Sequence, residues 1–80
     1  MSIYTNETKR MTFGAIMARG DYYPVIELID GSHVRIEGYG QDAATGRYWL
    51  QWAAIKGDRW NRVPDCDPSM ELTIIPENWV

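Results

Sequence analysis

The chain has little cysteine, no apolar run long enough to cross a membrane and no cluster of positive charge. Its 80 residues include one cysteine, Cys66, which excludes an intramolecular disulfide. The net charge is -3 and the eight basic residues are scattered, which disfavours binding to a phosphate backbone. The N-terminus lacks the basic start and apolar run of a signal peptide. We therefore expect a cytoplasmic protein without membrane association, and we do not expect nucleic acid as its ligand.

Apolar residues are plentiful by contrast. They make up 45% of the chain and include four tryptophans and five tyrosines, enough to build a core without a disulfide or a metal. A chain of this length has no room for a second core. We expect residues 11–80 to form a single β domain, preceded by residues 1–10 as a tail, with a short edge strand as the alternative.

Residues 23–39 predict two strands joined by a turn. Val34 alternates with polar neighbours on the second strand, and on the first strand Ile26 alternates with Val25 and Glu27. A two-residue loop at Asp30-Gly31 would place core residues opposite solvent residues. A three-residue loop at 29–31, with Gly31 in the left-handed conformation, keeps the two faces consistent. This register pairs Ile26 with Val34, Glu27 with His33 and Leu28 with Ser32.

The neighbouring segments predict further strands. Residues 11–19 are apolar on both faces and indicate a strand covered on two sides, with a short helix weakened by Gly14 as the alternative. Residues 47–55 indicate a strand with Trp52 inward and Trp49 outward. Its alternative is a helix over residues 42–56. Residues 64–69 are expected to form an acidic loop before a last strand.

Short strands joined by tight turns favour closure, because an open sheet of this size leaves long unpaired edges. We therefore expect an all-β fold, a five- to six-stranded antiparallel meander that closes into an SH3-like or OB-like barrel. The alternative is an α+β fold in which a helix at about residues 42–56 packs on a sheet.

The C-terminal pentapeptide 76–80, Pro-Glu-Asn-Trp-Val, is similar to the Pro-Ser-Asn-Tyr-Val ending of SH3 domains. In that family the proline and tyrosine help to line a groove for proline-rich peptides. The resemblance covers five residues, and the chain lacks the Ala-Leu-Tyr-Asp-Tyr start and the acidic loop of the family. It therefore does not assign the chain to that family.

No set of residues is spaced for catalysis. Asp65-Cys66-Asp67 combines two carboxylates and a thiol, but a calcium loop needs further oxygen ligands and a distal glutamate at set spacing. Cys66 and the only histidine, His33, lie far apart in sequence, and no third group is placed to orient them. We expect a protein that is not an enzyme and that carries no metal and no cofactor.

Aromatic and acidic residues are the candidate binding residues. Exposed tryptophan and tyrosine are common at interface hot spots, and a domain this small cannot bury all of Trp49, Trp60, Trp79 and Tyr39. A rim of acids would select a basic partner surface; its members are Asp58, Asp65, Asp67 and Glu77. In the alternative interpretation, two or three tryptophans build the core and the others pack on Arg47, Arg59 or Arg62 through cation-π contacts.

The sequence thus predicts a small protein-binding module whose partner is another protein. One form of such a module is an inhibitor encoded by a phage or mobile element, which blocks a host or defence protein in the host cytoplasm as anti-CRISPR proteins do. A second class is a homo-oligomeric structural or assembly subunit. A third is a small barrel that binds single-stranded nucleic acid by stacking bases on its aromatic side chains.

Overall fold

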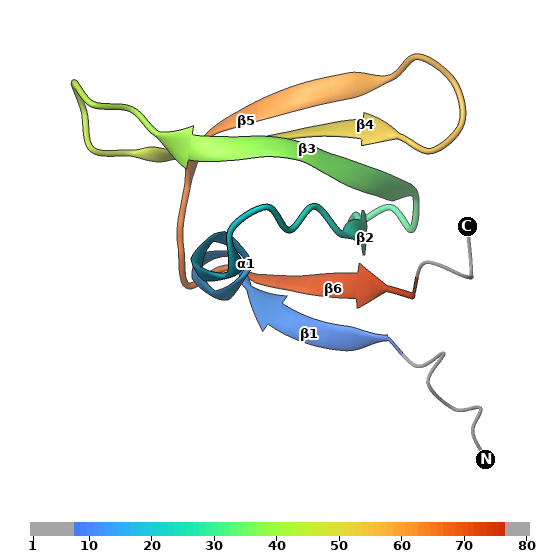
Figure 1. Cartoon of the computed structure of the whole chain (residues 1–80). Helices are drawn as coiled ribbons and strands as arrows, with labels where there is room; N and C mark the ends of the chain where they lie inside the picture. Colours follow the sequence, from blue (N-terminus) through green and yellow to red (C-terminus); the bar gives the residue numbers. More distant parts are fainter. Residues whose placement is uncertain (1–7, 77–80) are drawn as a thin grey trace.

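The computed structural model describes residues 8–76, and this part of the chain is mostly β (Figure 1). The strands form one antiparallel sheet in the order β1-β6-β2-β3-β4-β5. No helix within residues 8–76 is long and apolar enough to cross a membrane. Along the chain the elements are β1 (Lys9–Thr12), α1 (Phe13–Arg19), β2 (Val25–Glu27), β3 (His33–Gln41), β4 (Tyr48–Ala54), β5 (Trp60–Cys66) and β6 (Glu71–Ile75).

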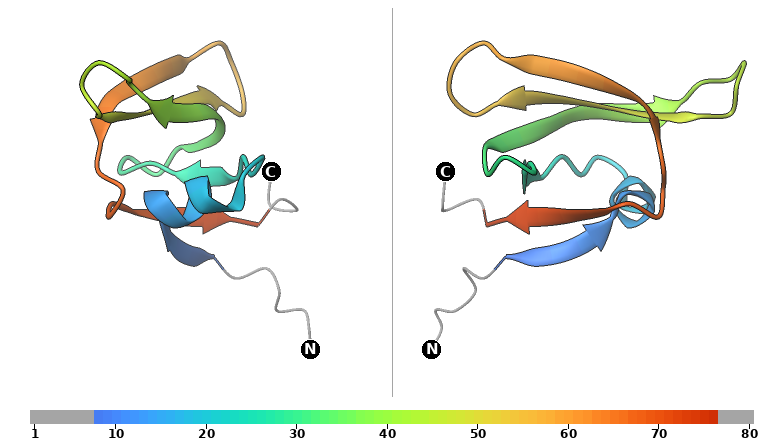
Figure 2. Two further views of the ribbon diagram at one scale, coloured as in Figure 1. Left: turned by 60° about the vertical axis from the view of Figure 1, so that its left-hand side comes forward. Right: turned by 180° about the vertical axis from the view of Figure 1, so that it is seen from behind.

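The sheet bends so strongly that β3, β4 and β5 lie over β6 and β1, with β2 at the bend (Figures 1 and 2). Helix α1 lies at one end of the space between these two layers. The apolar side chains that fill this space come from both layers and from α1. Burial of their apolar surface therefore holds the two layers together. The buried cluster consists of Phe13, Ile16, Ile26, Val34, Ile36, Leu50, Trp52, Cys66 and Ile74.

The predicted closure into a barrel is wrong. Within residues 8–76, β1 pairs with β6 alone and β5 with β4 alone, so the sheet keeps two open edges. The prediction assumed that only closure removes unpaired edges, but natural sheets also protect edges locally. Here β1 is short and carries Lys9 and Arg10, while β5 contains Pro64, which has no backbone donor. Lys9 and Arg10, expected to lie in an N-terminal tail, thus begin an edge strand.

The hairpin predicted around residues 29–31 is confirmed. Ile26 pairs with Val34, and Glu27 pairs with His33. The Leu28 N–H donates to the Ser32 carbonyl at 2.8 Å, which closes the three-residue loop. Gly31 has a φ of 87°, the left-handed conformation that the loop requires.

The strand predicted over residues 11–19 ends at Thr12, and from Phe13 the helix alternative is confirmed. The Thr12 hydroxyl accepts the Ala15 N–H at 3.1 Å and caps the helix. Gly14 lies in the first turn, where its N–H donates to the Pro68 carbonyl at 2.8 Å. A Cβ at this position would lie 3.2 Å from the same carbonyl oxygen. The glycine therefore permits a close backbone contact and does not weaken the middle of a helix.

The strand predicted over residues 47–55 is confirmed as β4, and the helix alternative over 42–56 is wrong. Asp42 closes a turn: its carboxylate accepts the Ala44 N–H at 2.8 Å and its carbonyl accepts the Gly46 N–H at 2.7 Å. Gly46 has a φ of 75°, which ends any helical course. Trp52 points inward and is 5% exposed, as its position in the alternation predicts.

The acidic loop predicted over residues 64–69 begins later than expected, because β5 continues to Cys66. Cys66 pairs with Tyr48, and its side chain is buried in the core. The register between β4 and β5 shifts between Tyr48 and Leu50, so an extra residue has to be accommodated. Asp65 absorbs it with a φ of 60°, a conformation that aspartate tolerates better than most residues.

Candidate protein-binding face

The outward side chains of β3, β4 and β5 form one continuous surface, which we call the outer face. It is built from Glu37, Trp49, Gln51, Trp60 and Arg62. Gln51 pairs with Arg62 across β4 and β5, and opposite residues of a strand pair share a face. Strand alternation sends Trp49 and Gln51 outward because the side chains between and after them fill the core.

A chain of hydrogen bonds crosses all three strands of the outer face. The Gln51 Nε2 donates to Glu37 Oε1 at 3.5 Å. Arg62 donates to Gln51 Oε1 through Nε at 3.2 Å and through Nη2 at 3.0 Å. Because two of its donors meet one oxygen, the Arg62 guanidinium is fixed in orientation despite its exposure.

Trp49 forms a platform beside this chain. Its ring covers the backbone of β3: a Cβ at Gly40 would lie 3.0 Å from Trp49 Cζ2, and one at Gly38 would lie 3.6 Å from Cζ3. The Arg62 guanidinium carbon stands 4.3 Å from the ring centroid, within the range of a cation-π contact. Trp49 is thus half-buried and held on both sides, unlike a free side chain.

Trp60 is the exposed aromatic residue of the outer face. Its side chain lies on the same side of the sheet as Ala53, with which it pairs. It is 64% exposed, and among residues 8–76 it makes no side-chain hydrogen bond, ion pair or ring contact. A large apolar ring in water without a partner is the feature most expected of an interface anchor.

The expectation that Tyr39 shares a surface with Trp49 is wrong. Strict alternation from Ile36 would send Tyr39 outward. The register of β3 against β4 shifts between Ile36 and Gly38, however, and Tyr39 then pairs with the inward-pointing Leu50. This bulge reverses the face of every later residue of β3.

Tyr39 is half-buried on the inner side of the sheet, where it packs against other aromatic residues. Its hydroxyl donates to the Tyr22 carbonyl at 3.0 Å. Its ring meets Phe13 edge-on with 6.2 Å between centroids, and Tyr23 lies 5.4 Å away at a tilt. Tyr39 therefore anchors the segment between α1 and β2 and is removed from the candidate binding residues.

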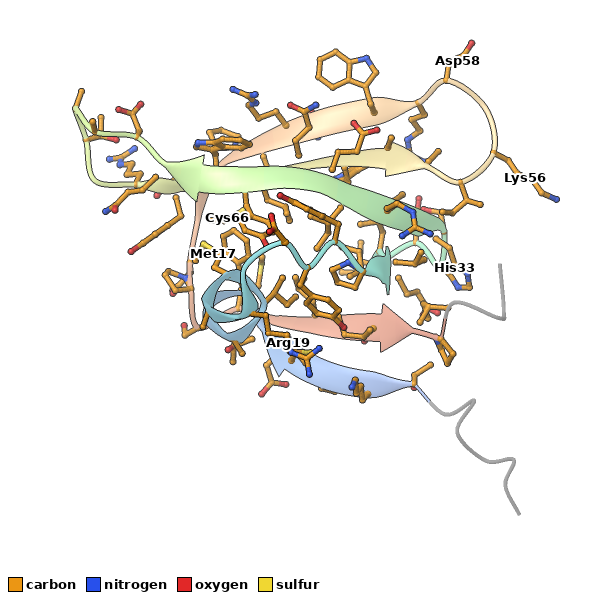
Figure 3. The ribbon with its side chains drawn as sticks, viewed as in Figure 1. Met17, Arg19, His33, Lys56, Asp58 and Cys66 are labelled. Atoms are coloured by element: carbon orange, nitrogen blue, oxygen red, sulfur yellow. The ribbon has the colours of Figure 1, made fainter. Side chains whose placement is uncertain are left out.

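The acids expected to form a rim do not lie together. Asp58 is in the β4–β5 connection (Figure 3), whereas Asp65 is near the far end of β5, roughly 20 Å along the strand. Asp65 Oδ2 lies 3.5 Å from Arg47 Nη1. Asp67 Oδ1 accepts the N–H and the hydroxyl of Ser69 at 2.9 and 2.8 Å. Glu77 and Trp79, the remaining predicted residues, lie outside the described part of the chain.

Hydrogen bonds from serine lower the pKa of two aspartates in turns, Asp67 and Asp30. The two bonds from Ser69 favour the ionised carboxylate and hold the pKa of Asp67 below its usual 3.8. Asp30 has the same arrangement, in which the Ser32 hydroxyl, followed by the Ser32 backbone, lowers its pKa. Both carboxylates are thus local turn elements that remain charged at neutral pH.

The thiol and imidazole are not arranged for nucleophilic chemistry. Burial, and secondarily the charge of Asp65, raises the pKa of the Cys66 thiol, which disfavours the reactive thiolate. His33, the first residue of β3, lies at the opposite end of the sheet from Cys66 (Figure 3). Its Nε2 is 3.3 Å from Glu27 Oε1. No group of three or more His, Cys, Asp or Glu side chains within residues 8–76 could hold a metal ion.

The cation-π interpretation accounts for two tryptophans and not for Trp60. Trp52 lies in the core with the Arg59 guanidinium 5.3 Å from its ring, and Arg62 covers Trp49. Arg47, the third arginine considered, pairs with Asp65. Glu37 and Gln51 were not among the predicted binding residues, although their polar positions on two alternating strands were a usable signal.

A second surface feature lies at the end of the sheet where the β2–β3 and β4–β5 connections meet. A hollow of about 510 Å³ there is lined by Ile55, Lys56, Arg59 and His33, among others. Ile29, in the β2–β3 loop, is fully exposed. Ile29 lies in a loop outside the strands that form the outer face, so a substitution there is a control for substitutions on the outer face.

No family model, no curated protein and no solved structure matches this chain. Any function must therefore be argued from its own residues.

Proposed function

We propose that this protein is a non-enzymatic protein-binding module and that it contacts its partner through the outer face. The observation that carries the proposal is the state of Trp60, which is 64% exposed beside a platform of fixed side chains. Tryptophan supplies a large rigid contact area at a low entropic cost when it binds. The neighbouring Trp49 and Arg62 are already ordered, so they lose little freedom on binding.

The partner is a protein surface with an apolar recess for the Trp60 indole. Polar groups surround the indole on the outer face, and such a rim excludes water from a central anchor. Two acids, Glu37 and Asp58, are exposed near this region and would favour basic groups on the partner. An inhibitor that acts by steric occlusion fits this mode of binding, and its phage or mobile-element origin stays a prediction.

Capture with the full chain tests the proposal. Proteins bound from a lysate would be identified, purified and titrated against the wild type, Trp60→Ala and Ile29→Ala by calorimetry. We expect Trp60→Ala to weaken binding about tenfold or more, the size of a hot-spot loss, and Ile29→Ala to leave it unchanged.

Two outcomes would overturn the assignment. Equal affinities of Trp60→Ala and the wild type would remove the outer face from the interface. A salt-dependent shift with single-stranded oligonucleotides, lost in Trp60→Ala, would instead place the protein in the nucleic-acid class, because bases stack on exposed indoles.

A further inference from the structure

The two edges of the sheet are protected to different degrees. β1 is short and carries two basic residues, Lys9 and Arg10, which discourage pairing with another strand. β5 is longer, and β4 is its only strand partner within residues 8–76. Pro64, which has no backbone donor, and the bulge at Asp65 protect its C-terminal half, whereas the half that begins at Trp60 contains neither and carries one basic residue, Arg62.

The hydrogen-bond pattern shows which backbone groups of β5 face this open edge. The Ala54 N–H donates to the Arg59 carbonyl at 2.8 Å, so Arg59 directs its groups toward β4. Hydrogen-bonded and non-hydrogen-bonded positions alternate along an antiparallel pair. The N–H and C=O groups of Trp60 and Arg62 therefore point away from β4.

We propose that this edge pairs with β5 of a second copy of the chain, antiparallel, about a twofold axis at Asn61. In this register Trp60 exchanges backbone hydrogen bonds with Arg62 of the second copy, and Arg62 does so with Trp60 of the second copy. The two sheets then join into one, which removes an open edge from each copy.

The residues of β5 favour this register over the two in which the axis is shifted by one residue. A shift in one direction sets Arg62 opposite Arg62 of the second copy, which brings like charges together, and sets Pro64, with no donor, opposite Trp60. A shift in the other direction needs Asp58, which lies outside β5, to act as a strand residue. The register centred on Asn61 uses only residues that are already in the strand.

Side-chain complementarity adds to the backbone pairing. Opposite residues share a face, so Trp60 lies against Arg62 of the second copy on the outer face. That guanidinium already stands 4.3 Å from its own Trp49 ring. Pairing places each cation between two indoles and gives Trp60 the ring contact that it lacks within residues 8–76.

The dimer is expected to be weak and dependent on concentration. A pair of short strands buries less than the roughly 1,200 Å² of a standard stable interface, and each copy carries a net charge of -3. The inference does not require a second kind of protein. It concerns pairing of β5 with a second copy, in which Trp60 lies against Arg62, whereas the proposed function concerns a different protein that contacts the outer face.

Disulfide trapping of Asn61→Cys tests the register. On the axis, the two substituted positions would have Cα atoms about 4.5 to 5.5 Å apart, within the range of a disulfide. We expect this variant to form a covalent dimer under mild oxidation much faster than Asp58→Cys, its exposed control in the adjacent connection. The wild type controls for the buried Cys66. Equal rates for the two variants would overturn the register.

Sedimentation of the full chain up to about 1 mM tests the association itself. We expect self-association in the wild type and in Ile29→Ala, and an association about tenfold weaker in Trp60→Ala. A strict monomer at every concentration would overturn the inference. Partner binding that is lost in Trp60→Ala would then leave the proposed function standing.

Discussion

The guanidinium of Arg62 lies over Trp49 on the outer face, 4.3 Å from the ring centroid, while two of its nitrogens donate to Gln51. These contacts come from neighbouring strands, so they hold the tryptophan and the arginine in place before any partner arrives. Trp60, two residues before Arg62 on β5, lacks such contacts in the described part of the chain. The outer face thus combines an ordered platform with one free anchor.

Gly40→Ala should displace the Trp49 ring and destabilise the fold. The added Cβ would lie 3.0 Å from Trp49 Cζ2 and 3.1 Å from Nε1, closer than normal contact. We expect a loss of about 1 to 2 kcal/mol in the free energy of unfolding, measured in urea. Gly38→Ala is the matched control, because its Cβ would meet the same ring at an ordinary 3.6 Å. Equal losses in the two variants would contradict the platform geometry.

Gly14→Ala should fail to stabilise α1, although alanine is the better helix former. Helix propensity alone favours alanine by about 1 kcal/mol. The new Cβ would, however, lie 3.2 Å from the Pro68 carbonyl oxygen, a backbone atom that accepts the Gly14 N–H. We expect a net loss of stability in thermal unfolding. The reverse change at an exposed position, Ala15→Gly, should cost only the propensity difference, and a gain in Gly14→Ala would contradict the close contact.

Among the three tryptophans within residues 8–76, Trp60 should be the one whose fluorescence iodide quenches most readily. It is 64% exposed, whereas Trp52 is 5% exposed and Trp49 is half-buried. Trp60→Phe should therefore remove more quenchable emission than Trp49→Phe does. Its free energy of unfolding should stay within about 0.5 kcal/mol of the wild type, because few contacts are lost. Unchanged quenching in Trp60→Phe would show that the indole is covered.

Ser69→Ala should raise the pKa of Asp67 toward 3.8, because it removes the hydroxyl donor, the smaller of the two causes that lower it. Ser32→Ala should likewise raise the pKa of Asp30, where the hydroxyl is the larger of the two Ser32 causes. Carboxyl titrations by NMR would measure both shifts. An unchanged pKa in either variant would contradict the hydrogen bond assigned to it.

Asp30 and Asp67 also determine in which direction the free energy of unfolding changes with pH. Each has a lower pKa in the folded chain than in the unfolded chain, so the unfolded chain takes up protons first as the pH falls. Their contribution to the free energy of unfolding is complete above the ordinary pKa of 3.8. It is lost as the pH falls through the folded values. Acid unfolding of Ser32→Ala should accordingly depend less steeply on pH in this window.

Local patterns account for the parts of the fold that could be predicted. The alternation of Val34 and Ile36 with polar residues, together with a glycine able to adopt positive φ, was sufficient for the first hairpin and its register. The same period placed Trp52 inward and Trp49 outward. These features depend on residues that are close in sequence, so they can be predicted without knowing which distant residues pack against the strands.

The failures lie where distant residues decide the conformation. Residues 13–19 are too few for helix propensity to dominate, and the contact of Gly14 with Pro68 comes from the far end of the chain. The face of Tyr39 depends on a bulge that no periodicity marks. The outer-face residues Glu37 and Gln51 likewise acquire their role only when β3 and β4 meet.

The sequence by itself determined a small, mostly β protein with a three-residue hairpin loop and the inward and outward sides of its central strand, because period and turn chemistry are local properties. Only the tertiary structure decided that, among residues 8–76, the sheet stays open, Tyr39 turns inward and Trp60 lies exposed on an edge strand. Strand order and bulges arise from packing between segments far apart in the chain, and that packing determines which groups are left without a partner.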